Sequence, residues 1–188
     1  MTQDVKEILE ESKTILHGHF LLTSGLHSPT YVEKFRVLQY PTHTEYLCRL
    51  MADHYRDRDV QVVAGPTLGG IIIAYEVAKQ LGARSIFAER VGEKRAFRRG
   101  LSIVPGDRVL VVDDIMTTGG SVRDVVEAVE EAGGLVLGVA VMVDRSVGEI
   151  DLKAPLFSCY RLAIPTYSPD ECPQCATGMP LSSPGRSQ

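Results

Sequence analysis

The feature that most restricts the fold of this chain is an apolar run, Leu135 to Val143, that no polar residue interrupts. A strand that reads as a continuous apolar run is covered on both faces, which is typical of parallel sheets. A second apolar strand, Arg108 to Val112, precedes a helical segment with valines at helical spacing that ends near Gly133. Strands that alternate with helices in this way predict an α/β fold, a parallel sheet with helices on both faces.

The remaining segments extend this pattern and add a different one near the amino terminus. Further core elements are expected at Val60 to Ala64, Ile71 to Leu81, Ser85 to Ala88 and Phe157 to Leu162, the second of them a helix and the others strands. Before them, Asp4 to Ser12 is typical of a short amphipathic helix, and His17 to Val37 of a hairpin or two small strands. Thr42 with Glu45 has the spacing of a capping box at the start of another helix.

Length and composition indicate one domain of an ordinary globular protein. The 188 residues are 44% hydrophobic, which is enough for a substantial core. We expect a single domain over 1–188, in which about 1–40 form a small separate element and about 165–188 form a tail. The proline, glycine and serine of that tail favour an extended or partly disordered end.

Charge and hydropathy exclude several classes of protein. The net charge of -4 argues against a general nucleic-acid binder. The longest charge-free stretch, Val60 to Tyr75, is interrupted by Pro66 and three glycines and falls short of a membrane span. The first residues lack the apolar core of a signal peptide, so we expect a cytoplasmic protein with reduced thiols.

The segment Val109 to Val122, VLVVDDIMTTGGSV, carries the most specific chemistry. Its strand ends in adjacent carboxylates, and a helix begins after a turn rich in threonine and glycine. Glycines let backbone N–H groups approach a ligand closely, and a helix amino terminus favours an anion. Carboxylates can accept hydrogen bonds from sugar hydroxyls. The segment therefore predicts a site for a ribose 5-phosphate, formed by Asp113, Asp114, Ile115, Met116, Thr117, Thr118, Gly119, Gly120 and Ser121.

A simpler interpretation of this segment is a glycine-rich turn in which Ser121 and Asp124 cap the helix. The complete string is more specific, and it resembles the phosphoribosyl pyrophosphate motif of type I phosphoribosyltransferases. The resemblance implies the fold of that family and binding of 5-phosphoribosyl 1-pyrophosphate (PRPP) by the residues above. The chain has no G-x-x-x-x-G-K-[ST] loop, which disfavours a nucleotide triphosphatase.

Three further segments resemble the orotate phosphoribosyltransferases within that family. His19 to Glu33, HFLLTSGLHSPTYVE, is similar to their F-x-L-x-S-G-x-x-S-P-x-Y stretch, which implies a small hood over the base. Gly65 to Gly70, GPTLGG, implies backbone N–H groups near the pyrophosphate. Arg90 to Gly100, RVGEKRAFRRG, resembles a basic loop that reaches the active site of the other subunit in a homodimer. The resemblance implies catalytic roles for Arg90 and Lys94, although a run of charges alone is more typical of a solvated loop.

Arg145 follows the long apolar strand, where the resemblance implies contact with orotate together with Thr117. A guanidinium that binds in bidentate fashion is well suited to a planar acid. The alternative is an arginine paired with Asp144 at the surface. The chain departs from the family at Thr23 and Gly69, where many members carry lysine, and it has no histidine in the basic loop. These departures leave open which groups bind pyrophosphate and which loop residue supplies charge.

Cys172 and Cys175 form one C-x-x-C near the end of the chain, in a tail, CPQCATGMPLSSPG, that resembles some bacterial orotate enzymes. A zinc site needs about four ligands, and no histidine follows His54. Cys159, Cys48 or another subunit could contribute, but nothing in the sequence requires it.

The histidines His17, His19 and His27 lack a ligand spacing such as H-E-x-x-H, so we assign no residue of the chain as a metal ligand. The family resemblance does imply Mg²⁺, bound mainly through PRPP.

The expected reaction is transfer of the phosphoribosyl group of PRPP to nitrogen 1 of orotate, giving orotidine 5'-monophosphate and pyrophosphate for UMP synthesis. Position and electrostatics would carry the rate, without a covalent nucleophile. The expected partners are PRPP, orotate and a second copy of the chain, with no nucleic acid or membrane. Two alternatives are a purine phosphoribosyltransferase and a regulator that senses PRPP. The regulator would need a nucleic-acid-binding surface, and neither a helix-turn-helix region nor a basic excess is present.

Overall fold

The computed structural model describes residues 4–22 and 24–184. Thr23, one of the departures from the family pattern, lies outside these ranges. The chain divides into two compact units, one of 38–162 and one that combines 1–37 with 163–188. The amino-terminal residues and the tail therefore fall in the same unit, although they lie at opposite ends of the sequence.

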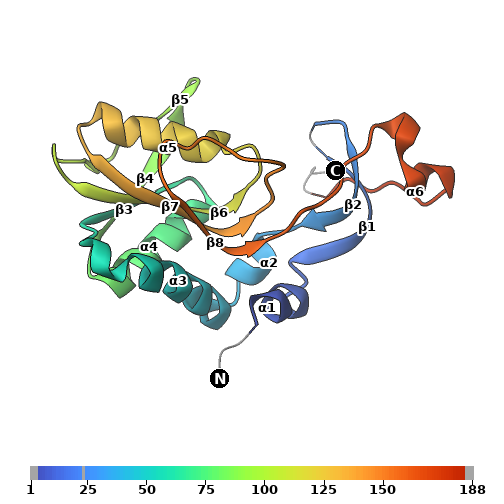
Figure 1. The fold of residues 1–188 in the computed structure, drawn as a ribbon, viewed down its shortest axis with the longest axis horizontal. Helices are drawn as coiled ribbons and strands as arrows, with labels where there is room; N and C mark the ends of the chain where they lie inside the picture. Colours follow the sequence, from blue (N-terminus) through green and yellow to red (C-terminus); the bar gives the residue numbers. More distant parts are fainter. Residues whose placement is uncertain (1–3, 23, 185–188) are drawn as a thin grey trace. The chain divides into compact units, whose positions relative to one another are not determined.

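The larger unit is built on a six-stranded sheet with the order β5-β4-β3-β6-β7-β8 (Figure 1). Its strands are β3 Val62–Pro66, β4 Arg84–Val91, β5 Lys94–Phe97, β6 Arg108–Met116, β7 Leu135–Asp144 and β8 Leu156–Arg161. Neighbouring strands are parallel except β4 and β5, which form an antiparallel hairpin. The predicted parallel sheet is confirmed.

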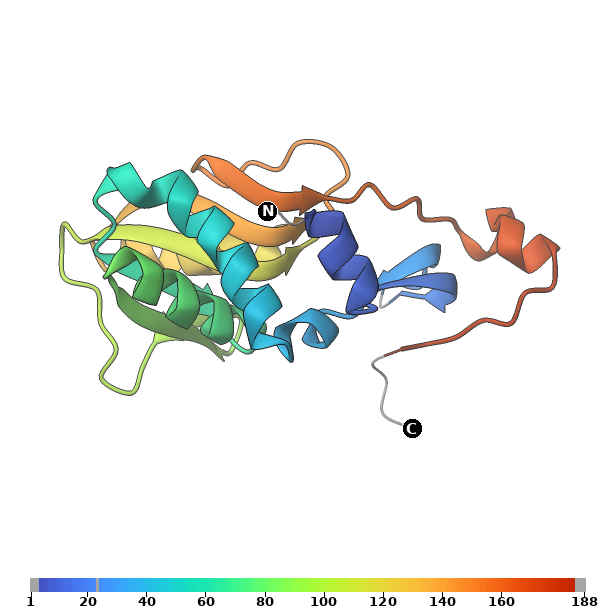
Figure 2. The same cartoon turned by 90° about the horizontal axis from the view of Figure 1, so that it is seen from below.

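Helices cover both faces of this sheet, as predicted. The helices are α3 Pro41–Tyr55, α4 Gly69–Leu81 and α5 Gly120–Glu131, and a 3-10 turn spans Arg56–Arg58. Helices α3 and α4 lie on one face and α5 on the other (Figures 1 and 2). On the face of the sheet that α5 covers, valines of β6 and α5 pack in one apolar cluster. They include Val109, Val111, Val125 and Val129. Among the described residues, no helix is both long and apolar enough to cross a membrane.

The smaller unit contains a short helix, a hairpin and the tail. Its elements are α1 Val5–Glu11, β1 Ile15–Leu21, β2 His27–Val32, the 3-10 turn Pro169–Glu171 and α6 Pro173–Ala176, and a further short helix, α2 Phe35–Leu38, spans the boundary between the units. The predicted helix and hairpin are confirmed. The tail is extended, but it is fixed to the hairpin: Ser182 bridges to Phe20, and Tyr167 to His27. The expected extended tail is held at both ends of the stretch 167–182 by backbone hydrogen bonds.

Two local predictions are also wrong. Thr42 does not cap a helix, because α3 begins at Pro41 and Tyr40 is its N-cap, without a side-chain hydrogen bond. Proline suits a first helical position, where its missing N–H costs nothing. The strand predicted to end at Val112 continues to Met116, because its backbone stays paired with β7 beyond the apolar residues.

Candidate active site

The two predicted acidic residues lie inside β6 and are almost fully buried, Asp113 at 6% and Asp114 at 1% exposure. Successive side chains of a strand point to opposite faces of the sheet. Asp113 accordingly lines a hollow beside the turn that precedes α5, and Asp114 lies against the first turn of α4 at Gly69. The oxygen Oδ1 of each accepts the N–H of the following residue, at 2.8 Å for Asp113 and 2.6 Å for Asp114.

The hollow beside Asp113 has a volume of about 60 Å³ and gathers almost the whole predicted phosphate site. Its lining consists of Asp113, Ile115, Met116, Thr117, Thr118, Gly119, Gly120, Ser121 and Val122. The hydroxyl-bearing residues Thr117, Thr118 and Ser121 are exposed. Asp114 is the one predicted PRPP residue outside this lining. The structure therefore brings together a set of hydroxyls, backbone amides and one carboxylate at the end of β6.

The amino terminus of α5 is open to a ligand. Its N-cap is Gly119, with φ of 75° and no side-chain hydrogen bond, so the interpretation in which Ser121 and Asp124 merely cap the helix is wrong. A Cβ at Gly119 would meet Ile150 Cγ2 at 2.9 Å, and φ is in the region that favours glycine. The first N–H groups of a helix have no intrahelical partners, and they can bind an anion here.

The glycine turn between β3 and α4 approaches the same edge of the sheet. Helix α4 begins at Gly69, where a Cβ would collide with the carboxylate of Asp114. The missing side chain at this position therefore makes room for the buried acid. It also gives a physical reason why a residue larger than glycine would require Asp114 to move.

The basic loop is a hairpin formed by β4 and β5. Arg90 is exposed and pairs in register with Arg95. Lys94 Nζ lies 2.6 Å from Glu131 Oε1 at the far end of α5, and the hydrogen bond and charge of Glu131 raise the pKa of Lys94. Within the described residues, no hydrogen bond or ion pair joins Arg90 or Lys94 to the phosphate turn. Any role in catalysis would therefore require movement of the hairpin or a second copy of the chain.

Arg95 is the hairpin residue that reaches the site, and the sequence analysis did not single it out. Its Nη1 donates to Thr67 Oγ1 at 3.4 Å, and its Nη2 donates to Ser121 Oγ at 3.5 Å. Its Nε lies 3.9 Å from Asp124 Oδ2, and its side chain is only 8% exposed. The guanidinium thus connects the two turns. The alternation of side chains along β5 was the only sequence signal that separated Arg95 from its cationic neighbours.

Arg145 comes to the edge of the sheet beside Thr117. Its N–H donates to Met116 O at 2.8 Å, which sets the residue after β7 next to the residue after β6. The neighbouring Asp144 is buried, and its Oδ2 lies 3.5 Å from Arg161 Nε. The structure therefore gives Asp144 a cationic partner on β8, and it brings Arg145 and Thr117 together as predicted.

The larger unit also holds two cysteines that the sequence left unassigned. Burial raises the pKa of Cys159 to about 12 and also raises the pKa of Cys48. The Sγ of Cys159 donates to Leu47 O at 3.4 Å. Since the thiolate is the reactive form, burial disfavours a nucleophilic role for these thiols.

Comparison with known proteins shows which domain family and which enzymes this chain is similar to. Residues 39–166 match the model of the phosphoribosyl transferase domain. An orotate phosphoribosyltransferase of Caldanaerobacter subterraneus subsp. tengcongensis is 49% identical over 183 residues, which cover 97% of this chain and 96% of that protein.

Solved structures of orotate phosphoribosyltransferases are also similar to this chain. The orotate phosphoribosyltransferase of Aeropyrum pernix has a TM-score of 0.73 at 26% identity, over 84% of this chain and 93% of that one. That of Mycobacterium tuberculosis H37Rv in complex with PRPP has a TM-score of 0.69 at 30% identity, over 86% and 98%.

Proposed function

The chain belongs to the orotate phosphoribosyltransferases of the phosphoribosyl transferase domain family, and on this premise we propose that it transfers the phosphoribosyl group of PRPP to orotate. The products are orotidine 5'-monophosphate and pyrophosphate, in the biosynthesis of pyrimidines. The observation that carries the proposal is the 49% identity over nearly the full length of both chains. The family predicted from the sequence is confirmed.

The proposed reaction uses the residues at the carboxyl ends of β3, β6 and β7. The 5'-phosphate is bound by the hydroxyls and amides of the hollow from Thr117 to Ser121, where the uncapped helix amino terminus favours an anion. Asp113 and Asp114 accept hydrogen bonds from the ribose hydroxyls. Arg145 and Thr117 hold orotate, so that its nitrogen 1 faces the anomeric carbon. Positioning and fixed charges lower the barrier, and pyrophosphate leaves as nitrogen attacks.

Mg²⁺ fits this site as an ion bound mainly through PRPP. Buried carboxylates beside the phosphate hollow supply the oxygen-rich, negatively charged surroundings that a hard cation prefers. The ion would neutralise charge on the pyrophosphate. The residues of this chain would orient the sugar and the base.

We assign the neutralisation of the leaving group to Arg90 and Lys94 of the exposed hairpin. Because Lys94 binds Glu131 at the other end of α5, the proposal includes a homodimer in which the hairpin serves the other subunit's site. A cytoplasmic location is part of the same proposal, because PRPP and orotate are metabolites of that compartment.

One assay tests the choice of base. The purified chain is incubated with PRPP, Mg²⁺ and either orotate, adenine or hypoxanthine, and pyrophosphate release is measured. We expect release with orotate alone, because Arg145 offers a charge that suits a carboxylate and that neutral purines do not require. Turnover with adenine or hypoxanthine, and none with orotate, would assign the chain to purine salvage instead.

Arg95 provides a second prediction. In Arg95→Met the two turns lose their shared hydrogen bonds, and KM for PRPP should rise roughly 2 to 10-fold, the effect of about 0.5–1.5 kcal/mol. Initial rates at varied PRPP concentration measure it. Arg99→Met is the matched control, because Arg99 is exposed and its guanidinium donates to Glu89 rather than to either turn. Equal KM values in the two variants would remove Arg95 from the site.

A further inference from the structure

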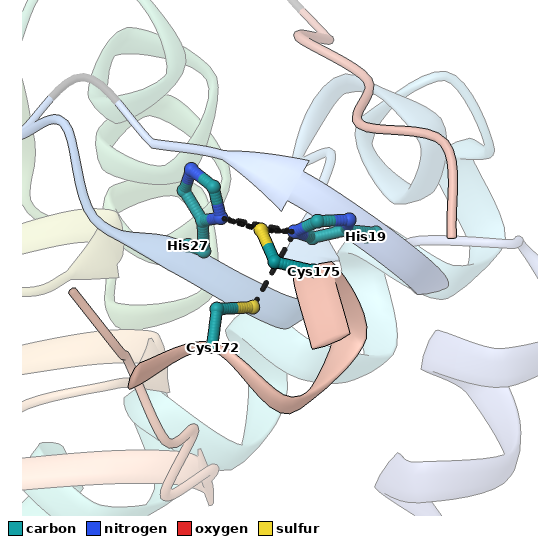
Figure 3. A group of neighbouring side chains, drawn as sticks. All are labelled: His19, His27, Cys172 and Cys175. Atoms are coloured by element: carbon teal, nitrogen blue, oxygen red, sulfur yellow. Dashed lines mark hydrogen bonds between the residues drawn. The ribbon is translucent and has the colours of Figure 1, made fainter. Parts of the chain in front are cut away.

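The C-x-x-C of the tail meets two histidines of the amino-terminal hairpin. His19 lies on β1, His27 begins β2, Cys172 precedes α6 and Cys175 lies within it. One ligand atom from each of the four lies within 4.8 Å of all the others. Figure 3 shows the imidazoles and thiols turned toward a common centre. All four residues belong to the smaller unit, so the cluster is separate from the phosphate hollow of the larger one.

Three of the distances within the cluster lie in the range expected around a tetrahedral metal ion, and the one between the two imidazole nitrogens is shorter. The Nε2 of His19 lies 3.4 Å from the Sγ of Cys172 and 3.7 Å from the Sγ of Cys175. The Nδ1 of His27 lies 3.3 Å from the Sγ of Cys175 and 3.0 Å from the Nε2 of His19. Zinc bonds of about 2.3 Å to sulfur and about 2.05 Å to nitrogen place neighbouring ligand atoms roughly 3.3 to 3.8 Å apart.

A backbone carbonyl next to His19 fixes the tautomer of its ring in the form that can bind a metal ion. Its Nδ1 lies 2.8 Å from the carbonyl oxygen of Met179, which can only accept a hydrogen bond. The proton is therefore on Nδ1, and the lone pair of Nε2 points into the cluster. A backbone carbonyl that fixes the other ring nitrogen in this way is the usual outer partner of a metal-bound histidine.

Hydrogen bonds alone account poorly for the way in which these four side chains meet. Each ring nitrogen has one lone pair or one proton, yet the Nε2 of His19 faces two sulfurs and another nitrogen. His19, His27 and Cys172 are buried, with exposures of 3%, 5% and 3%, so water has little access to them. A single cation at the centre would be met by all four lone pairs.

Hydrogen bonds join the tail to the amino-terminal hairpin before and after the two cysteines. Tyr167 exchanges two backbone hydrogen bonds of 2.9 Å with His27, and the N–H of Ser182 donates to His19 O at 2.9 Å. Gln174 Nε2 also donates to Gly18 O at 2.6 Å. The segment with the two cysteines lies between Tyr167 and Ser182, and both thiols contact the histidines. His27 pairs with Leu21, and the register of the hairpin shifts between His17 and Phe20, the stretch that contains His19.

We propose that His19, His27, Cys172 and Cys175 form a structural zinc site that joins the tail to the amino-terminal hairpin. Two thiolates and two imidazoles are a ligand set of tetrahedral zinc, whereas iron–sulfur clusters generally take four cysteines. Four protein ligands leave no open position for a substrate, so the role is structural rather than catalytic. The proposal revises the expectation that no residue is a metal ligand, and it does not depend on the proposed reaction.

The test begins with the metal content of the full-length chain. Tag-free protein is purified under reducing conditions, without chelator, from cells grown with added zinc, and its metals are measured by plasma mass spectrometry. We expect about one zinc per chain, as for other four-ligand sites. Protein without zinc would overturn the proposal, as would copper or iron in its place or a Cys172–Cys175 disulfide found by peptide mass mapping.

Variants then identify the ligands. Cys175→Ser is the primary variant, because Cys175 is exposed and its loss disturbs packing least. It should lose zinc, and so should His27→Asn. Cys159→Ser and His17→Asn remove a thiol and an imidazole outside the cluster and should keep it. Full zinc content in Cys175→Ser and His27→Asn would overturn the assignment.

Cobalt gives a readout that does not depend on how stable a variant is. Wild-type protein stripped of zinc and supplied with Co²⁺ should develop the absorption bands of a tetrahedral site with thiolate ligands, and its thermal unfolding midpoint should rise when the metal returns. An octahedral cobalt spectrum in the wild-type protein would contradict the proposed ligand set.

Discussion

Replacing Lys94 with alanine is expected to lower kcat roughly 100 to 1000-fold, with a much smaller change in KM for PRPP, because a charge that stabilises the leaving pyrophosphate acts mainly in the transition state. Lys94 is exposed and rests on Glu131 in this structure, so it is available to move. Steady-state rates with saturating orotate measure the effect. Arg90→Ala should show the same kind of loss to a smaller degree.

Glu131→Gln is the matched control for Lys94. It breaks the same ion pair and leaves the lysine charged, and solvent screens an exposed pair of this kind, so its loss should change stability little. We expect Glu131→Gln to retain wild-type kcat, because the lysine no longer has to leave a partner. If both variants lost activity equally, the ion pair itself would be what matters. Wild-type kcat in both Lys94→Ala and Arg90→Ala would mean that the hairpin has no catalytic role.

Asp114→Asn should reduce kcat/KM roughly 10 to 150-fold, the equivalent of about 1.5–3 kcal/mol for a charged hydrogen-bond partner. The amide keeps the shape of the carboxylate beside Gly69, but it loses the charge and one acceptor for the ribose hydroxyls. Initial rates at varied PRPP concentration give the ratio.

Asp53→Asn is the control for that change, because Asp53 is exposed on α3 and pairs with Arg56. It should behave as the wild-type protein does. A wild-type kcat/KM in Asp114→Asn would remove the proposed contact between Asp114 and the ribose.

Signals that lie within a few residues predicted most of the sheet and the phosphate turn. The apolar run from Leu135 became β7, and the string from Val109 to Val122 became the end of β6, the hollow and the start of α5. These features are local because the spacing of apolar residues, the hydrogen bonds of a helix and the conformations of glycine depend on residues close together in the sequence. Boundaries were less accurate where pairing with another strand decided them, as at Met116.

Contacts between distant segments could not be predicted in the same way. The function of Arg95 depends on which side of β5 faces α5, and side-chain alternation along the strand separates the two sides without deciding which one faces the helix. The proposed zinc ligands are the clearest example: Cys172 and His19 are 153 residues apart. Cys48 and Cys159, the further ligands that the sequence offered for the C-x-x-C, are therefore not the residues that the fold brings to it.

By itself, the sequence determined the alternation of strands and helices, the family and the residues of the phosphate turn, because short-range patterns encode all three. Only the tertiary structure decided that Arg95 connects two turns, that Asp113 and Asp114 face different neighbours, and that two histidines meet two cysteines. The physical reason is that such contacts depend on strand order, register and the path of the tail. Those follow from the packing of the whole chain rather than from any one segment.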